Sequence, residues 1–103
     1  MIWFQDVHGR KIRFTDERRK HIEEDHPEMQ GQIDKIRETL ADPELIVRSR
    51  ADPMVELFYR HYRNTPVMEK YLCVVVKTVE DSFLITAYFT DAIKRGEILW
   101  GKR

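Results

Sequence analysis

The chain has 103 residues, a formal net charge of zero at neutral pH, 35% charged residues and one cysteine. This length fits one domain, residues 1–103, with a single modest core. A lone cysteine excludes an internal disulfide, and zero net charge argues against strong nonspecific nucleic-acid binding, because neutralising phosphates takes positive charge.

The sequence shows no signal peptide, and no apolar run approaches the ~18 residues of a transmembrane helix. We therefore expect a cytoplasmic domain with no membrane partner, and Cys73, inside the apolar run YLCVVVK, is expected in the core. The charge is uneven, since residues 16–44 carry ten acids against five bases and residues 45–103 carry seven against ten. A small basic cleft is compatible with this distribution.

The first forty residues predict a hairpin followed by two helices. IWFQDV and RKIRF are the hairpin strands, with Gly9 in the turn. Thr15 is a favourable N-cap for a helix that runs to about Asp25, because Pro27 biases His26 away from helical geometry. A second helix, ended near ADPE, is predicted by an apolar stripe at helical spacing: Met29, Ile33, Ile36 and Leu40.

From residue 44 onward the pattern changes to strands rich in β-branched and aromatic residues. They are LIVRSR, MVELFYRHY, KYLCVVVKTV and SFLITAYFT, separated by turn signals, and DAIKRGEILW adds a turn and a last edge strand. The sequence thus predicts an α+β domain, in which the N-terminal hairpin and two helices pack on one face of a four-stranded antiparallel sheet.

Alternation along the strands sorts side chains between the two faces. The helices are expected to cover the aliphatic row of Leu72, Val74 and Val76. On SFLITAYFT, one set is Phe83, Ile85, Ala87 and Phe89, and the other is Leu84, Thr86, Tyr88 and Thr90. The uncovered face should carry Tyr71, Lys77, Thr86 and Tyr88, and Arg60 joins it if Glu56, Phe58 and Tyr62 are its same-face neighbours, which assumes the register of that strand.

This uncovered face predicts a phosphate site. Arginine offers a fork of donors, lysine a point charge, and threonine and tyrosine neutral hydrogen bonds. Aromatic side chains beside them could stack unpaired bases: Phe58, Tyr59, Tyr62 and Tyr71. Basic loop edges would have a supporting role: Arg48, Arg50, Lys94 and Arg95. The alternative is an ordinary solvated sheet face.

The segment KHIEEDHPEM holds two histidines and several carboxylates, which are metal-ligand types. A spacing of five places His21 and His26 about 140° apart around a helix, whereas a helical metal pair needs a spacing of three or four. A metal site built on His21, Asp25, His26 and Glu28 is therefore a minor alternative, and no metal or cofactor is predicted. Both histidines could also be structural, with His21 packed beside Ile22.

Taken together, several ordered segments carry a family resemblance: RFTDERRKHIEEDHPEM, IRETLADPELIVRSR, LFYRHY, YLCVVVK and FLITAYFTDAIKRGEILW. Over about residues 10–100 the chain resembles small phage- and cyanobacteria-associated domains of the barnase–EndoU–colicin–RelE-like nuclease superfamily. The resemblance implies two helices packed on a four-stranded antiparallel sheet. It also implies metal-independent RNA cleavage, often by a toxin held by an antitoxin or by a phage effector.

Carried over by position, the resemblance implies a catalytic set of His21, His26, Arg60, Lys77, Thr86 and Tyr88. In metal-free cleavage a base activates the ribose 2′-hydroxyl, an acid protonates the leaving 5′-oxygen, and cations stabilise the phosphorane. The function expected is therefore a toxin-like endoribonuclease that leaves a 2′,3′-cyclic phosphate. Its partners would be RNA and possibly a cognate antitoxin. The alternative is a non-catalytic RNA- or protein-binding module on the same fold.

Overall fold

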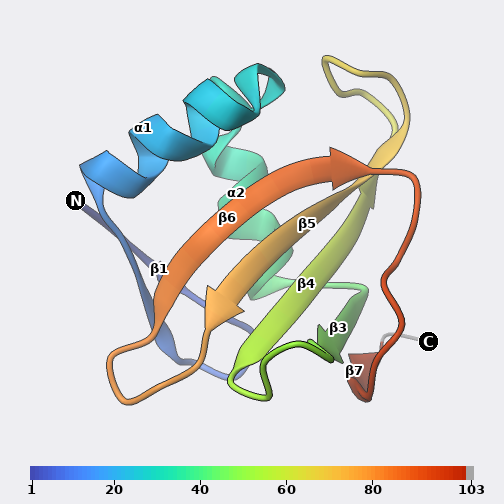
Figure 1. The fold of residues 1–103 in the computed structure, drawn as a ribbon. Coiled ribbons are helices and arrows are strands. Elements are labelled where there is room, and N and C mark those ends of the chain that lie inside the picture. The colour runs from blue at the N-terminus through green and yellow to red at the C-terminus, as the bar shows by residue number, and fades with distance from the viewer. Residues whose placement is uncertain (102–103) are drawn as a thin grey trace.

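The structure is a computed structural model that describes residues 1–101. The elements follow the predicted order along the chain: a hairpin, then the helices, then a run of strands (Figure 1). The elements are β1 (Ile2–Gln5), β2 (Lys11–Phe14), α1 (Asp16–Asp25), the 3₁₀ turn η1 (Pro27–Met29), α2 (Ile33–Ala41), β3 (Leu45–Arg48), β4 (Val55–Tyr62), β5 (Lys70–Lys77), β6 (Phe83–Thr90) and β7 (Ile98–Gly101).

All strands found in residues 1–101 join one sheet, in the order β1-β2-β6-β5-β4-β3-β7. The α+β class and the two helices are confirmed, but the four-stranded sheet was wrong, and so was the packing of the hairpin on its face, because the hairpin strands β1 and β2 extend the sheet itself. The antiparallel run β3 to β6 forms the middle of a seven-stranded mixed sheet. The hairpin joins it through a parallel bridge between Arg13 and Phe83, and β7 pairs with β3 at the other edge.

Local signals around the first helix act as the sequence predicts. Gly9 has a φ of 82° in the hairpin turn, where a side chain would be strained. The Thr15 hydroxyl accepts a hydrogen bond from the backbone N–H of Arg18 at 3.1 Å, and α1 ends at Asp25. The second helix is shorter than expected: Met29 belongs to η1, and α2 begins only at Ile33.

The main core lies between the sheet and the helices, with α2 behind the sheet in Figure 1. Leu72, Val74 and Val76 are buried there against Ile36 and Leu40, which confirms the face predicted for β5. Within residues 1–101 neither α-helix is long and apolar enough to cross a bilayer.

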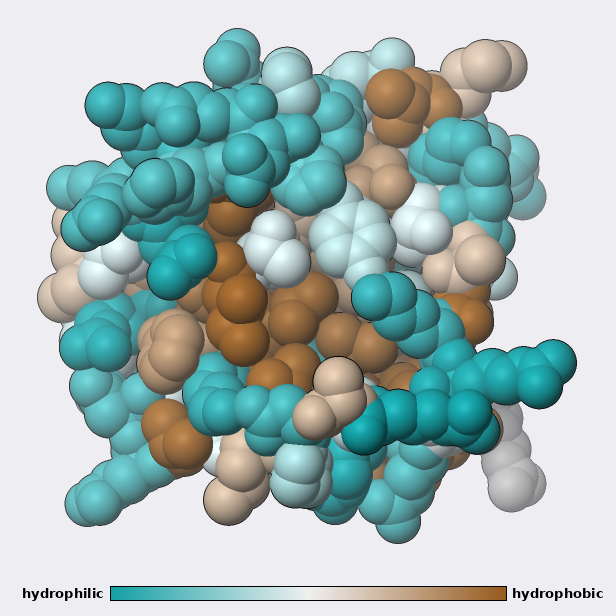
Figure 2. All heavy atoms as spheres, in the orientation of Figure 1, coloured by the Kyte–Doolittle hydropathy of each residue, from teal (hydrophilic) through white to brown (hydrophobic). Residues whose placement is uncertain are grey.

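The other side of the sheet, which we call the open face, carries a second apolar cluster. Its buried members are Val47, Val55, Leu57, Tyr59, Cys73 and Val75, with Tyr71, Ile85 and Tyr88 packed against them. Figure 2 shows this side as a hollow with a hydrophobic floor and a hydrophilic rim. The open face is therefore recessed rather than flat.

A bulge in β6 alters the alternation predicted for that strand. The register shifts where Val75 pairs with Thr86 and Val76 pairs with Leu84. Leu84 consequently joins the helix-side core and Ile85 the open-face cluster, which reverses their predicted faces. Beyond the bulge, Ala87 on the helix side and Tyr88 on the open face follow the prediction.

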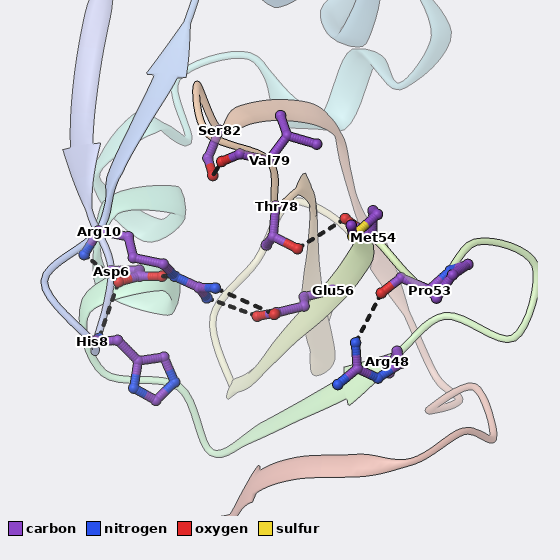
Figure 3. Close-up of polar contacts among 10 residues, drawn as sticks. All are labelled: Asp6, His8, Arg10, Arg48, Pro53, Met54, Glu56, Thr78, Val79 and Ser82. Atoms are coloured by element: carbon purple, nitrogen blue, oxygen red, sulfur yellow. Dashed lines mark hydrogen bonds and ion pairs between the residues drawn. The ribbon is translucent and has the colours of Figure 1, made fainter.

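A partly buried ion-pair network ties the first hairpin to the middle of the sheet (Figure 3). The Arg10 guanidinium donates to Asp6 at 2.6 Å and to Glu56 at 2.7 Å. The Asp6 carboxylate also accepts the backbone N–H groups of His8 and Arg10. Because the Asp6 side chain is fully buried, this network satisfies a charge that would otherwise be costly.

Candidate functional site

Arg60 does not lie on the open face, so this part of the predicted site was wrong. It shares a side of β4 with Phe58 and Tyr62, as assumed, but that side faces the helices. Its guanidinium donates to the Asp42 carbonyl at 2.7 Å and lies 3.4 Å from the Glu38 carboxylate. These contacts hold Arg60 against the end of α2.

The same reversal removes two predicted base-stacking residues from the open face. Phe58 is fully buried in the main core, and the Tyr62 hydroxyl donates to Glu38 at 2.7 Å. Tyr59, in contrast, points to the open face and is packed in its floor. Both sides of β4 carry aromatic residues, so alternation alone could not tell which side faces the helices, and the wrong side was assigned to the open face.

The other three members of the predicted phosphate site lie on the open face. Thr86 pairs with Val75, and Tyr88 pairs with Cys73. Lys77, the last residue of β5, pairs with Val55 on the same face. However, the Lys77 ammonium forms a hydrogen-bonded ion pair with Asp52, so its charge is already compensated.

The floor of the open face contains a cluster of hydroxyl and thiol groups. Tyr59 and Tyr88 pair with Cys73 from the two neighbouring strands, and the Tyr59 hydroxyl accepts the backbone N–H of Lys94 at 3.0 Å. Burial raises the pKa of Cys73 to about 11, against smaller opposing effects of the Tyr88 and Tyr59 hydroxyls and of the positive charge of Lys94. Burial also raises the pKa of Tyr88, so its hydroxyl stays protonated at neutral pH.

His26 lies against this cluster from the end of α1. Its ring centroid is 5.6 Å from that of Tyr88, with 33° between the ring planes. Pro27 biases His26 away from helical geometry, so α1 ends at Asp25 and His26 is its C-cap with a non-helical φ of −133°. The helix stop visible in the sequence therefore places this imidazole beside a strand that is 62 residues away along the chain.

His21 lies elsewhere. Its Nε2 is 3.8 Å from Glu17, one turn earlier in α1, and 59% of its side chain is exposed. It lines a shallow surface hollow together with Thr15, Arg18 and Asp25. The contacts of His21 thus stay on the outside of α1, and of the two predicted histidines it is His26 that reaches Tyr88.

A basic corner flanks the open face where the segment 91–97 joins β6 to β7. Arg50, Lys94 and Arg95 line a hollow there with Leu57 as part of its wall. Within residues 1–101 these three cations have no carboxylate within ion-pairing distance. Arg48, the fourth predicted basic residue, is instead held by Glu97 at 2.8 Å and by the Pro53 carbonyl (Figure 3).

Carboxylates and histidines of residues 1–101 do not gather into a metal-binding group. Among the residues that the structure describes, no set of three or more His, Cys, Asp or Glu side chains is placed to hold a metal ion. The two histidines of the minor alternative have separate acidic neighbours. His21 lies 3.8 Å from Glu17, and His26 lies 3.7 Å from Glu28.

Cys73 is fully buried, which confirms the expectation that it is a core residue. One open-face residue with chemistry was missed from the sequence. His61 was not considered, and its imidazole Nε2 lies 3.0 Å from the Glu69 carboxylate. Its position two residues after Tyr59 on the same strand would have placed both on one face.

Comparison with known proteins adds no relative: a scan against family models, a search of curated proteins and a search of solved structures each returned no match. The nuclease resemblance therefore stays a prediction, and function has to be argued from the geometry of the open face.

Proposed function

We propose that this protein cleaves RNA without a metal ion at the open face of its sheet. In this reaction the ribose 2′-oxygen attacks phosphorus, the bond to the 5′-oxygen breaks, and a 2′,3′-cyclic phosphate is left. The observation that carries the proposal is the contact between the rings of His26 and Tyr88, next to the Lys94 segment. In this proposal three separate parts of the chain contribute to the site: His26 at the end of α1, Tyr88 in β6 and the segment 91–97.

Each group has a distinct role in this proposal. The His26 imidazole takes the proton of the 2′-hydroxyl, because imidazole is the side chain suited to proton transfer near neutral pH. The Tyr88 and Thr86 hydroxyls donate hydrogen bonds to the phosphate oxygens, and the leaving 5′-oxygen takes its proton from solvent water to become a 5′-hydroxyl. Lys94 and Arg95 stabilise the negative charge that grows on the phosphorane. Arg60 and His21 have no part in this arrangement.

A second candidate is a module that binds RNA without cleaving it. The raised pKa of Tyr88 favours this reading, since a phenol that holds its proton tightly is a weak acid for the leaving oxygen. The uncompensated cations at the basic corner need only a phosphate backbone as ligand. A cognate antitoxin, implied by the resemblance, remains a predicted partner with no assigned surface.

Incubation of purified protein with fluorescent single-stranded RNA in EDTA tests the first proposal. We expect wild-type protein to cleave, and His26→Ala to lose about 10²–10⁴-fold in rate, which is the usual contribution of general acid–base catalysis. His8→Ala is the matched control, because His8 is an exposed histidine in the turn between β1 and β2. Intact RNA would refute cleavage, and equal cleavage by both variants would refute the role of His26. Salt-dependent binding without cleavage would establish the second candidate.

A further inference from the structure

A second group of rings lies on the open face beyond the Tyr88 cluster. His61 and Tyr71 are paired across β4 and β5, with ring centroids 5.2 Å apart and planes at 70°. The Tyr71 ring in turn meets that of Tyr59 edge-on at 6.5 Å. These contacts make a continuous aromatic row from the floor of the hollow toward the β4–β5 hairpin.

The imidazole of His61 is held in this row by two contacts. Its Nε2 lies 3.0 Å from Glu69, and its ring meets that of Tyr71, while its backbone N–H donates to the carboxylate of Glu44. The side chain of His61 is 33% exposed, and Tyr71 is partly exposed as well. A ring pair that is both held in place and open to solvent has little orientation left to lose when a flat ligand stacks on it.

The position of Tyr71 relative to Tyr88 matches the spacing of neighbouring groups on one RNA strand. Tyr88 is paired with Cys73, and Tyr71 precedes Cys73 by two residues on the same face. Such diagonal neighbours in a sheet are about 7–8 Å apart. A nucleotide whose phosphate sits at Tyr88 can therefore set an adjoining base over Tyr71.

We infer that Tyr71 and His61 form a nucleobase-binding site for the nucleotide next to the bound phosphate, with Glu69 as the positioning residue of the imidazole. This inference rests on the proposed function, because it takes the phosphate site at Tyr88 as given. The ligand is an unpaired base of single-stranded RNA, held by stacking and so largely independent of base identity.

An abasic scan with uncleavable RNA tests the site. A labelled 2′-O-methyl octanucleotide lacks the attacking hydroxyl, so its affinity, measured by fluorescence anisotropy, reports binding alone. Removing its bases one at a time should weaken wild-type binding at one position by about five- to a hundredfold, as expected for one stacked base. In Tyr71→Ala and His61→Ala the same removal should change affinity less than about twofold, because the ring partner is already gone.

Controls separate stacking from a general loss of structure. Tyr71→Phe keeps the ring and should keep the wild-type abasic pattern, and His8→Ala should do the same. Equal sensitivity to base removal in the wild type and in both alanine variants would overturn the nucleobase site and leave the cleavage proposal to its own assay. Absence of any binding by wild-type protein would overturn the nucleobase site and the cleavage proposal together. If the protein cleaves ordinary RNA but base removal has the same effect in the wild type and the alanine variants, the nucleobase site alone is overturned.

Discussion

Replacing Gly96 by alanine should detach the basic segment 91–97 from the sheet. A Cβ at this position would lie 2.2 Å from the carbonyl oxygen of Arg48 and 2.8 Å from Cγ1 of Val47. The nearer atom belongs to the backbone of β3, where the Arg48 N–H also donates to the Glu97 carbonyl at 2.8 Å. Neither strand nor segment can yield without losing this hydrogen bond.

The size of the effect follows from these contacts. Inserting a methyl group into a packed site costs about 1–3 kcal/mol, and the lost hydrogen bond adds about 1 kcal/mol. We expect Gly96→Ala to lower the free energy of unfolding by about 2–4 kcal/mol. For a domain of this size the melting temperature should fall by roughly 8–32 °C. RNA affinity should fall too, since Lys94 and Arg95 move with the segment.

Thermal and urea unfolding followed by circular dichroism measure the stability change, and anisotropy with labelled RNA measures the affinity. Gly101→Ala is the matched control, because its added Cβ would meet only the Leu45 Cδ1 atom at an ordinary 3.8 Å. If Gly96→Ala unfolds at the same temperature as Gly101→Ala, the close approach of the segment to β3 is refuted.

Three further predictions concern stability. Arg10→Met and Glu56→Met should each cost about 2 kcal/mol, yet the double variant less than their sum by about 1–2 kcal/mol, because either single change already removes the Arg10–Glu56 ion pair; urea unfolding of all four proteins closes this cycle, and additive losses would contradict it. The raised pKa of Cys73, about 11 against an ordinary 9.0, means that the unfolded chain loses this proton first, so stability is complete below pH 9 and declines by roughly 2–3 kcal/mol toward pH 11. Urea midpoints at pH 8 and 10.5 should therefore diverge more in the wild type than in Cys73→Ala, and identical pH dependence would be evidence against the buried thiol. Arg60→Met should cost about 1 kcal/mol through lost contacts with the end of α2 and leave RNA affinity unchanged; a large drop in affinity would return Arg60 to the site.

Elements set by local chemistry were predictable from the sequence. The Thr15 cap, the Gly9 turn and the helix stop before Pro27 depend on neighbouring residues alone, and each lies where expected. The aliphatic row of β5 was also assigned to the correct face. Its three consecutive large apolar side chains on one side left little choice about which side the helices cover.

Features that depend on distant partners were not predictable in the same way. On β4 both faces carry large apolar or aromatic residues, so Arg60 was assigned to the wrong side. The β6 bulge inverted Leu84 and Ile85, since alternation assumes an uninterrupted ladder. The hairpin is joined to β6 by a single parallel bridge. A contact this short produces no recognisable sequence pattern in either strand.

The candidate site shows the same division. Its residue types were found, including His26, Tyr88, Thr86 and Lys94, because polar and aromatic side chains stand out in apolar strands. Their mutual arrangement was not found, since the contact of His26 with Tyr88 depends on how α1 packs beside β6. Ion pairing was equally hidden: nothing in the sequence showed that Lys77 and Asp52 would neutralise each other.

The most direct test of the proposed active site is the chemistry of the product ends. A DNA oligonucleotide with one ribose restricts 2′-hydroxyl attack to a single linkage, and mass spectrometry identifies both new ends. In EDTA we expect cutting only after the ribose, with a 2′,3′-cyclic phosphate on one product, a 5′-hydroxyl on the other, and loss of both in His26→Ala. Cutting at deoxyribose linkages, a 5′-phosphate product, or undiminished cutting by His26→Ala would contradict an active site at His26 and Tyr88.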